Sequence, residues 1–467
     1  MMSNRDKPTN YMIISLSGVL GIFWVDYLYV FSKLGMNARK IIILVFFLTI
    51  IGLFMALTKC SQRVKQNVFL VIFSLIIFEI MLQITAIMGL IPGLVIYRNL
   101  PYARVYCSRE GLGNSIMNRY GRYYPKFNLD SQAQRIVLIG DSFIEALGIS
   151  PHKNMGVILN NLLDNYAGPG KYSVLALGTS GMGPAQYLEM VKYAIKYFKP
   201  SEVLIFICLG NDFRDIDLKK QGGLGEAYKP ENYIYYILDS NGNLTLHPQS
   251  VKAQKSFNSR LELNNQSILK TLPVTISSYF MTPPVVETFG RILWQKAKGP
   301  QRGSGDEIAD QLERIGLDGF VFKKNLSTEA WEAITICLKI LQLCDKTARE
   351  NGVKLHLVTI PVFPKVFYRG KNASAFLETG EYDFDLPEKI LSKFAQEQGI
   401  QLLPMARYMQ VKNIDAKVIR SLFFHGTGHF TEQGHAFFAG ALFEKVWAKR
   451  KTDGNGGVSP LIRSDVE

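Results

Sequence analysis

Apolar positions divide the chain into two parts with different patterns. The N-terminal part contains three long apolar runs, at 11–32, 41–57 and 67–90. An apolar helix of about 20 residues is long enough to cross a bilayer. No small-residue cleavage site follows the first run, which argues against a removable signal peptide. We therefore expect residues 1–97 to form a membrane region of about three transmembrane helices.

Beyond residue 128 the pattern changes to short apolar runs that alternate with segments of helical spacing. The runs that predict buried strands are 136–139, 173–177, 203–209, 354–360 and 401–403. The segments that predict helices are 155–166, 186–198, 328–351, 388–397 and 436–447. Strands that alternate with helices are typical of a parallel sheet with right-handed crossovers. We expect an α/β fold over residues 129–448, as a three-layer α/β/α, flavodoxin-like parallel sheet.

Three segments do not follow this alternation. Residues 98–128 are aromatic and basic and indicate an extended connector. An insertion near 218–330 contains two β-like runs around Asp239-Ser240-Asn241-Gly242-Asn243, which predicts a hairpin at 233–246. The insertion is compatible with a lid, a membrane-lying patch or simple decoration, and we favour a lid. The tail at 449–467, rich in glycine and charge, is expected to be disordered.

The charge of the chain is strongly basic, with a formal net charge of +14. A positive net charge favours binding to nucleic acid, to an anionic membrane surface or to an acidic polymer. The sequence has no zinc knuckle, helix-turn-helix or aromatic-basic stripe, so we expect no nucleic-acid partner and take the lipid bilayer as the partner. Lys and Arg are balanced between the short loops and do not decide the orientation. We expect a multi-pass protein of a bacterial inner membrane, with the C-terminal domain on the extracytoplasmic side.

Cysteine spacing gives no sign of a bound metal. The five cysteines form no CxxC pair and no metal-type pattern. We expect neither a metal nor a cofactor.

A serine follows the first predicted strand of the α/β part. Gly140-Asp141-Ser142 comes directly after the apolar run 136–139, where the chain turns into a helix. Parallel sheets bind ligands at the carboxyl edge of their strands, and a helix start offers free N–H groups to an anion. Taken alone, the string also fits a plain helix cap at Ser142.

Three further motifs lie at comparable positions along the chain. They are a glycine turn at 178–183, Gly210-Asn211-Asp212 after the run 203–209, and Gly428-His429-Phe430-Thr431-Glu432-Gln433-Gly434-His435 before the last helix. With Gly140-Asp141-Ser142, these strings resemble blocks one, two, three and five of the SGNH (GDSL-type) hydrolases, in the order of that family. The resemblance covers residues 130–215 and 350–447, and the joint pattern is far more specific than any one string.

The resemblance implies a role for each motif. Ser142 would be the nucleophile and His429 the general base. The backbone N–H groups of Ser142 and Gly181 and the side-chain amide of Asn211 would form the oxyanion hole. These residue types suit acyl transfer, which needs a nucleophile, a base and donors aimed at a tetrahedral oxyanion. His435 fits a helix position better than the role of base.

One feature departs from the family pattern. An aspartate two or three residues before the histidine usually orients the imidazole, but here those places hold Thr427 and Gly426. Three explanations are open. The Thr427 hydroxyl or a backbone carbonyl orients His429 in a Ser-His dyad, a distant acid such as Asp415 substitutes, or the site is degenerate. We rank the dyad first because the nucleophile and the oxyanion groups are present.

Together these features predict a membrane-anchored serine esterase or O-acyltransferase. We expect it to act on O-acyl groups, such as acetyl, of a cell-envelope polysaccharide. Three spans are too few to carry an acyl group across a membrane, so a transferase would need a membrane partner as acyl donor. The alternatives are a lipid esterase or thioesterase, and a non-catalytic glycan-binding or scaffold protein.

Overall fold

A computed structural model describes most of the α/β part and a shorter stretch of the N-terminal part. Besides residues 59, 95–96 and 218, the described ranges are 61–88, 99–129, 132–216, 228–263, 319–362, 380–424 and 428–448. The chain divides into two compact units, Met1–Tyr123 with Glu262–Gln301, and Tyr124–Leu261 with Arg302–Glu467. The tail predicted to be disordered, 449–467, lies outside the described ranges.

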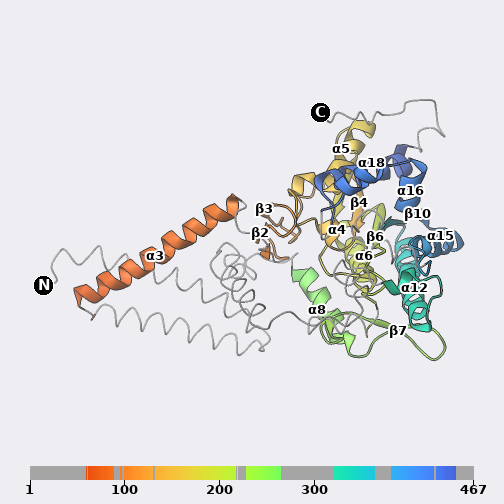
Figure 1. Cartoon of the computed structure of the whole chain (residues 1–467), viewed down its shortest axis with the longest axis horizontal. Helices are drawn as coiled ribbons and strands as arrows, with labels where there is room; N and C mark the ends of the chain where they lie inside the picture. The colour runs from red at the N-terminus through yellow and green to blue at the C-terminus, as the bar shows by residue number, and fades with distance from the viewer. Residues whose placement is uncertain are drawn as a thin grey trace. The chain divides into compact units, whose positions relative to one another are not determined.

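In the first unit, the main described element is one long helix, α3 (Gln62–Ile87), drawn in orange in Figure 1. Within its stretch Gln62–Thr85, the most apolar window of 18 residues has a mean hydropathy of 2.5 and is not buried inside the protein. Among the described residues it is the one helix long and apolar enough to cross a membrane, by length and composition alone. It overlaps the span predicted at 67–90, whereas the spans predicted near 11–32 and 41–57 lie outside the described residues.

The first unit also contains a small antiparallel sheet in the region predicted as an extended connector. Its strands β1 (Val95–Ile96), β2 (Arg104–Cys107) and β3 (Gly113–Ile116) pair in that order. Gly111 and Leu112 lie in the turn between β2 and β3, and Gly113 begins β3, so this part of the expected connector forms a hairpin.

The second unit is built on a five-stranded parallel sheet of order β10-β9-β6-β4-β5. Its strands are β4 (Gln134–Ile139), β5 (Tyr172–Ala176), β6 (Glu202–Cys208), β9 (Lys354–Ile360) and β10 (Gln401–Leu403). Counted along the chain this is the order 2-1-3-4-5, which is that of flavodoxin-like sheets. The expected parallel α/β sheet is therefore confirmed. Every residue of β6, the central strand, is buried, as its continuous apolar run predicts.

Helices cover both faces of this sheet. The helices are α4 (Ser142–Glu145), α5 (Met155–Ala167), α6 (Pro184–Phe198), α12 (Thr328–Glu350), α15 (Leu386–Gln398), α16 (Met405–Val411), α17 (Ala416–Ser421) and α18 (Glu432–Leu442). From β4 to β5 the chain steps in one direction, and from β5 to β6 it steps back past β4. Right-handed crossovers then place α5 and α6 on opposite faces. Helix α18 packs on α5, and α12 packs on α6 (Figure 1).

The strand order creates a switch point between β4 and β6. From β4 the chain continues toward one edge of the sheet, and from β6 it continues toward the other, so the loops that leave these two strands diverge. In open α/β sheets, ligands bind in the crevice at this point, outside the carboxyl ends of the strands. Ser142 follows β4 and Asn211 follows β6, so the fold places both motifs at the switch point.

The described part of the insertion contains the predicted hairpin. Strands β7 (Tyr236–Leu238) and β8 (Leu244–Leu246) pair antiparallel, and helix α8 (Ser250–Leu263) follows. Asp239 closes the turn, because its carboxylate accepts hydrogen bonds from the backbone of Asn241 and Asn243. Residues 219–227 and 264–318 of the insertion lie outside the described residues, and the expected lid stays a prediction.

Candidate active site

The turn that carries Ser142 is shaped by the residues on either side of it. A Cβ on Gly140 would lie 2.5 Å from Cγ1 of Ile144 and 3.2 Å from Cβ of Phe206, so only glycine fits where β4 ends. Asp141 is the N-cap of α4, and its carboxylate accepts a hydrogen bond of 3.0 Å from the backbone N–H of Phe143. Ser142 is therefore the first helical residue, directly beyond the carboxyl end of β4.

The structure brings Ser142 and His429 together. The Oγ of Ser142 lies 2.7 Å from Nε2 of His429, a hydrogen bond between residues 287 positions apart. The imidazole packs against Phe143, with 5.0 Å between ring centroids. Helix α18 begins just after it, because the Thr431 side chain accepts from the N–H of Gly434 as N-cap. This is the contact that a nucleophile needs with its general base.

The second histidine of the same motif, His435, has another environment. It is buried inside α18, and its Nδ1 accepts a hydrogen bond of 3.3 Å from the backbone N–H of Met155, at the start of α5. Burial, with a smaller contribution from the charge of His429, lowers the pKa of His435 to about 3. The imidazole is thus neutral at ordinary pH and holds α18 on α5.

The glycine turn at 178–183 lies directly against α4. A Cβ on Gly178 would meet the backbone N of Glu145 at 2.2 Å, which shows how closely the two segments approach. The buried Glu145 carboxylate accepts hydrogen bonds from the backbone N–H and the hydroxyl of Ser180, at 2.7 and 2.5 Å. The serine turn and the glycine turn are therefore locked together.

Gly181 lies at the exposed end of this turn with a φ of +75°, in the left-handed region that favours glycine. Its carbonyl accepts a hydrogen bond of 3.1 Å from the hydroxyl of Tyr233. Tyr233 belongs to the insertion and was interpreted from the sequence as part of a strand of the hairpin. In the structure it precedes β7, and it fixes the carbonyl of the residue expected to donate to the oxyanion.

Asn211 is held between two carboxylates. Its Nδ2 lies 3.2 Å from Oδ2 of Asp141 and 3.3 Å from Oδ2 of Asp215. An oxyanion at the switch point would share this amide with the carboxylates, since the amide has two hydrogens. The role of Asn211 as oxyanion donor stays a prediction.

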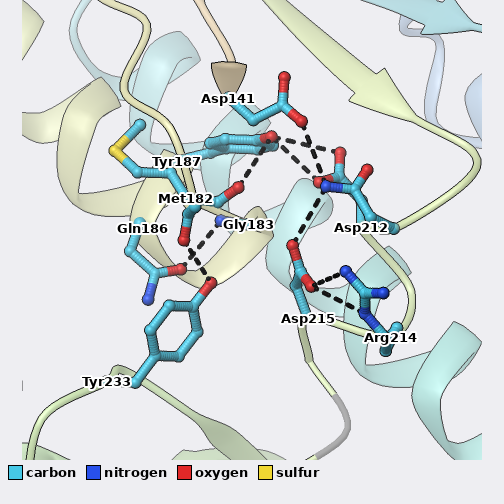
Figure 2. A network of polar contacts seen from close by, with 11 residues as sticks. Asp141, Met182, Gly183, Gln186, Tyr187, Asp212, Arg214, Asp215 and Tyr233 are labelled. Atoms are coloured by element: carbon cyan, nitrogen blue, oxygen red, sulfur yellow. Dashed lines mark hydrogen bonds and ion pairs between the residues drawn. The ribbon is translucent and has the colours of Figure 1, made fainter. Parts of the chain in front are cut away.

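Three buried carboxyls, Asp141, Asp212 and Asp215, lie near one another in this part of the site (Figure 2). Burial raises the pKa of Asp141, against the opposing effects of the Phe143 N–H and the charge of His429. Burial, and then the charges of Asp141 and Asp215, raise the pKa of Asp212 well above its ordinary value. Burial also raises the pKa of Asp215 to about 7, although Arg214 opposes it. Each of these carboxyls is harder to ionise than an exposed aspartate.

Asp212 and Asp215 do not have the same partners. The Asp212 carboxylate accepts hydrogen bonds from the Tyr187 hydroxyl at 3.0 Å and from the backbone N–H of Cys208 at 2.8 Å. It therefore ties β6 to α6. The sequence interpretation gave no role to these carboxyls, although their position just after a fully apolar strand is a signal that could have found them.

The structure describes one of the groups considered above for orienting His429. Thr427 and Gly426 lie outside the described residues. Asp415, named above as a distant acid, is an exposed N-cap of α17 whose carboxylate accepts from the backbone N–H of Lys417 at 2.6 Å. The charge of His429 opposes the rise that burial causes in the pKa of Asp141, so these two groups interact electrostatically. Among the described residues, no group of three or more His, Cys, Asp or Glu side chains is arranged to hold a metal ion.

Comparison with known proteins gives structural similarity only. No protein-family model matches the chain, and no curated protein matches it. Similar solved structures include TesA (TM-score 0.32, 11% identity, covering 67% of this chain and 98% of that one). A lipase/acylhydrolase from Enterococcus faecalis has a TM-score of 0.32 at 12% identity, covering 67% of this chain and 95% of that one. An acetylxylan esterase from Geobacillus stearothermophilus has a TM-score of 0.32 at 10% identity, covering 68% and 95%. Because these scores are low, the function proposed below depends on the contacts of Ser142 and its neighbours.

Proposed function

We propose that this chain is a serine esterase or O-acyltransferase in which Ser142 is the nucleophile and His429 the general base. The observation that carries the proposal is the 2.7 Å contact between Ser142 Oγ and His429 Nε2 at the switch point of the sheet. A serine that merely caps a helix has no need of an imidazole brought from a position 287 residues away. The ordered glycine turn beside it supports the same function.

The reaction follows from these contacts. Ser142 Oγ attacks the ester carbonyl carbon while its proton moves to His429 Nε2. The carbonyl oxygen becomes an oxyanion, stabilised by the N–H groups of Ser142 and Gly181 and by the Asn211 amide. The leaving alkoxide takes the proton from Nε2, which leaves an acyl-enzyme. Water or an acceptor hydroxyl then gives its proton to Nε2 and attacks the acyl carbon. The bond from that carbon to Ser142 Oγ breaks, Oγ takes the proton back from Nε2, and the free acid or the new ester leaves.

For the substrate we propose O-acyl groups, such as acetyl, of a cell-envelope polysaccharide. Helix α3 supports a location at a membrane, by its length and composition. Transfer in place of hydrolysis would require a membrane partner that supplies the acyl group. Within this proposal the catalytic domain lies on the extracytoplasmic side of a bacterial inner membrane.

The proposal is tested by labelling the full-length protein with a fluorophosphonate, which bonds to activated serines. We expect wild type to be labelled at Ser142, located by mass spectrometry, and Ser142→Ala and His429→Ala to lose nearly all labelling. Ser150→Ala is the matched control, because Ser150 is a nearby N-cap whose side chain makes no capping hydrogen bond. Folded wild type that takes no label, or label that persists in Ser142→Ala, would overturn the assignment.

A second measurement separates the substrate classes. Release of acetate from p-nitrophenyl acetate is compared with hydrolysis of the octanoate ester and with release of acetate from an O-acetylated polysaccharide. A clear preference for acetyl esters supports the proposed substrate. A clear preference for octanoate would replace it with a lipid or thioester substrate.

A further inference from the structure

The amide of Asn211 has two hydrogens, and in the structure each has a carboxylate acceptor. One acceptor is Asp141, at the end of β4, and the other is Asp215, in the loop after β6. This arrangement fixes which way the amide faces, since the reversed amide would bring its oxygen against two carboxylate oxygens. Asn211 therefore bridges the two loops that diverge at the switch point.

Asp215 itself is held in place by its remaining contacts. Its Oδ1 is bound by Arg214, with Nε at 3.4 Å and Nη2 at 3.3 Å, whereas its Oδ2 receives the Asn211 amide (Figure 2). Each carboxylate oxygen thus has its own partner. The backbone N–H of Asp215 also donates to the carbonyl of Asn211 at 2.8 Å, which closes the turn between the two residues.

The glycine turn closes the other side of Asp215. A Cβ on Gly183 would lie 2.8 Å from Cβ of Asp215 and 3.3 Å from the Tyr233 hydroxyl, so the turn packs tightly against this side chain. The same Cβ would lie 3.7 Å from Oδ2 of Asp215, so the glycine turn also borders the carboxylate.

We propose that Asp215 is a positioning residue of the candidate active site, which orients the Asn211 amide toward the place of the oxyanion. The inference rests on the proposed function and adds a residue to it. When the oxyanion forms, it takes over one of the two amide hydrogens, while the other hydrogen bond to a carboxylate keeps the amide oriented. Without Asp215 the amide has one anchor left, and its rotation is no longer fixed.

A kinetic double-mutant cycle on the full-length protein tests this role. The rate constant for fluorophosphonate labelling of Ser142 is measured for wild type, Asp215→Ala, Asn211→Ala and the double variant. We expect Asp215→Ala to slow labelling about tenfold in wild type and to have almost no effect once Asn211 is alanine, because Asp215 acts through that amide. Equal slowing in both backgrounds, or no slowing in wild type, would overturn the proposal.

Two further variants separate positioning from a structural effect. Asp212→Ala is the matched control: it removes a buried carboxyl from the same loop, whose partners are Tyr187 and Cys208. Asp212→Ala should change the labelling rate by the same factor in wild type and in Asn211→Ala. Asp215→Asn keeps an acceptor oxygen and should recover most of the labelling rate. If Asp215→Asn is labelled as slowly as Asp215→Ala, the positioning role of Asp215 is contradicted.

Failure of the proposed function is recognised separately, because then wild type itself is not labelled at Ser142. In that case the same cycle is measured as the shift in thermal unfolding temperature. Coupled shifts for Asp215→Ala and Asn211→Ala support the bridge between the two residues, and additive shifts overturn it.

Discussion

Gly178 is the position where one added carbon tests the geometry of the site most directly. A Cβ there would lie 2.2 Å from the backbone N of Glu145, 2.5 Å from the backbone C of Ile144 and 2.8 Å from its Cβ. Ordinary contacts of a Cβ begin near 3.4 Å. Two of these three neighbours are backbone atoms of α4, so Gly178→Ala must push the turn that carries Ser142 by about 1 Å.

The size of the effect follows from that displacement. Overpacking at such a site costs about 1–3 kcal/mol of unfolding free energy. A misplacement of about 1 Å at a reacting group costs about 100-fold in rate. We expect Gly178→Ala to remain folded at low temperature and to label with fluorophosphonate about 100-fold more slowly than wild type.

The assay combines the labelling rate with thermal unfolding of the same samples. Gly440→Ala is the control, because a Cβ at Gly440 in α18 meets nothing within 4 Å. That change should leave labelling unaltered and stabilise the helix by up to about 1 kcal/mol. If Gly178→Ala is labelled at the wild-type rate and unfolds at the wild-type temperature, the glycine turn does not approach α4 as closely as described.

The remaining predictions concern the groups that support the site. His435→Leu leaves the Met155 N–H without its acceptor and should lower the free energy of unfolding by about 1–3 kcal/mol. His435→Gln should lower it by less. Equal urea unfolding curves for His435→Leu and wild type would contradict the contact. Tyr233→Phe removes the hydrogen bond to Gly181 and should slow labelling several-fold with little change in unfolding temperature; an unchanged rate would separate Tyr233 from the site. The pKa of Asp215, raised by burial from 3.8 to about 7, makes its ionised form costly, so the stability contributed by this carboxyl is present below pH 4 and lost as the pH rises through 7. The free energy of unfolding of Asp215→Asn, measured in urea, should therefore rise relative to that of wild type by up to about 4 kcal/mol between pH 4 and pH 8. A difference between the two proteins that does not change with pH would refute the raised pKa.

Much of the sheet was predictable from the sequence because buried parallel strands consist of continuous apolar runs. The runs 136–139 and 203–209 match β4 and β6 within a few residues. The motifs at Ser142 and Asn211 were recognisable for a related reason, since polar residues directly after such runs lie at the carboxyl edge of the sheet. Their position relative to each other depends on the strand order, which the right-handed crossovers restrict.

Other features depend on contacts that no local pattern indicates. The sequence indicated that a helix starts at Gly140-Asp141-Ser142, but α4 ends after one turn because Ala146 adopts a φ of 58°, and no glycine at that position marks the end. The part played by Tyr233 depends on the packing of the insertion against the glycine turn. The bridge from Asn211 to Asp215 needs two side chains of one loop to face the same way, which becomes evident only when the loop is folded.

The order of the motifs along the chain has a consequence for biosynthesis. Ser142 leaves the ribosome 287 residues before His429, which at typical rates of translation is roughly 15–60 s earlier. Under the proposed function, the hydroxyl of Ser142 has no base until His429 is made and α18 docks on α5. A polypeptide that ends before His429 would therefore not react with acyl groups. Under the proposed function, reactivity would appear only after α18 is made, so this helix would act as a check that the α/β domain up to that point is present.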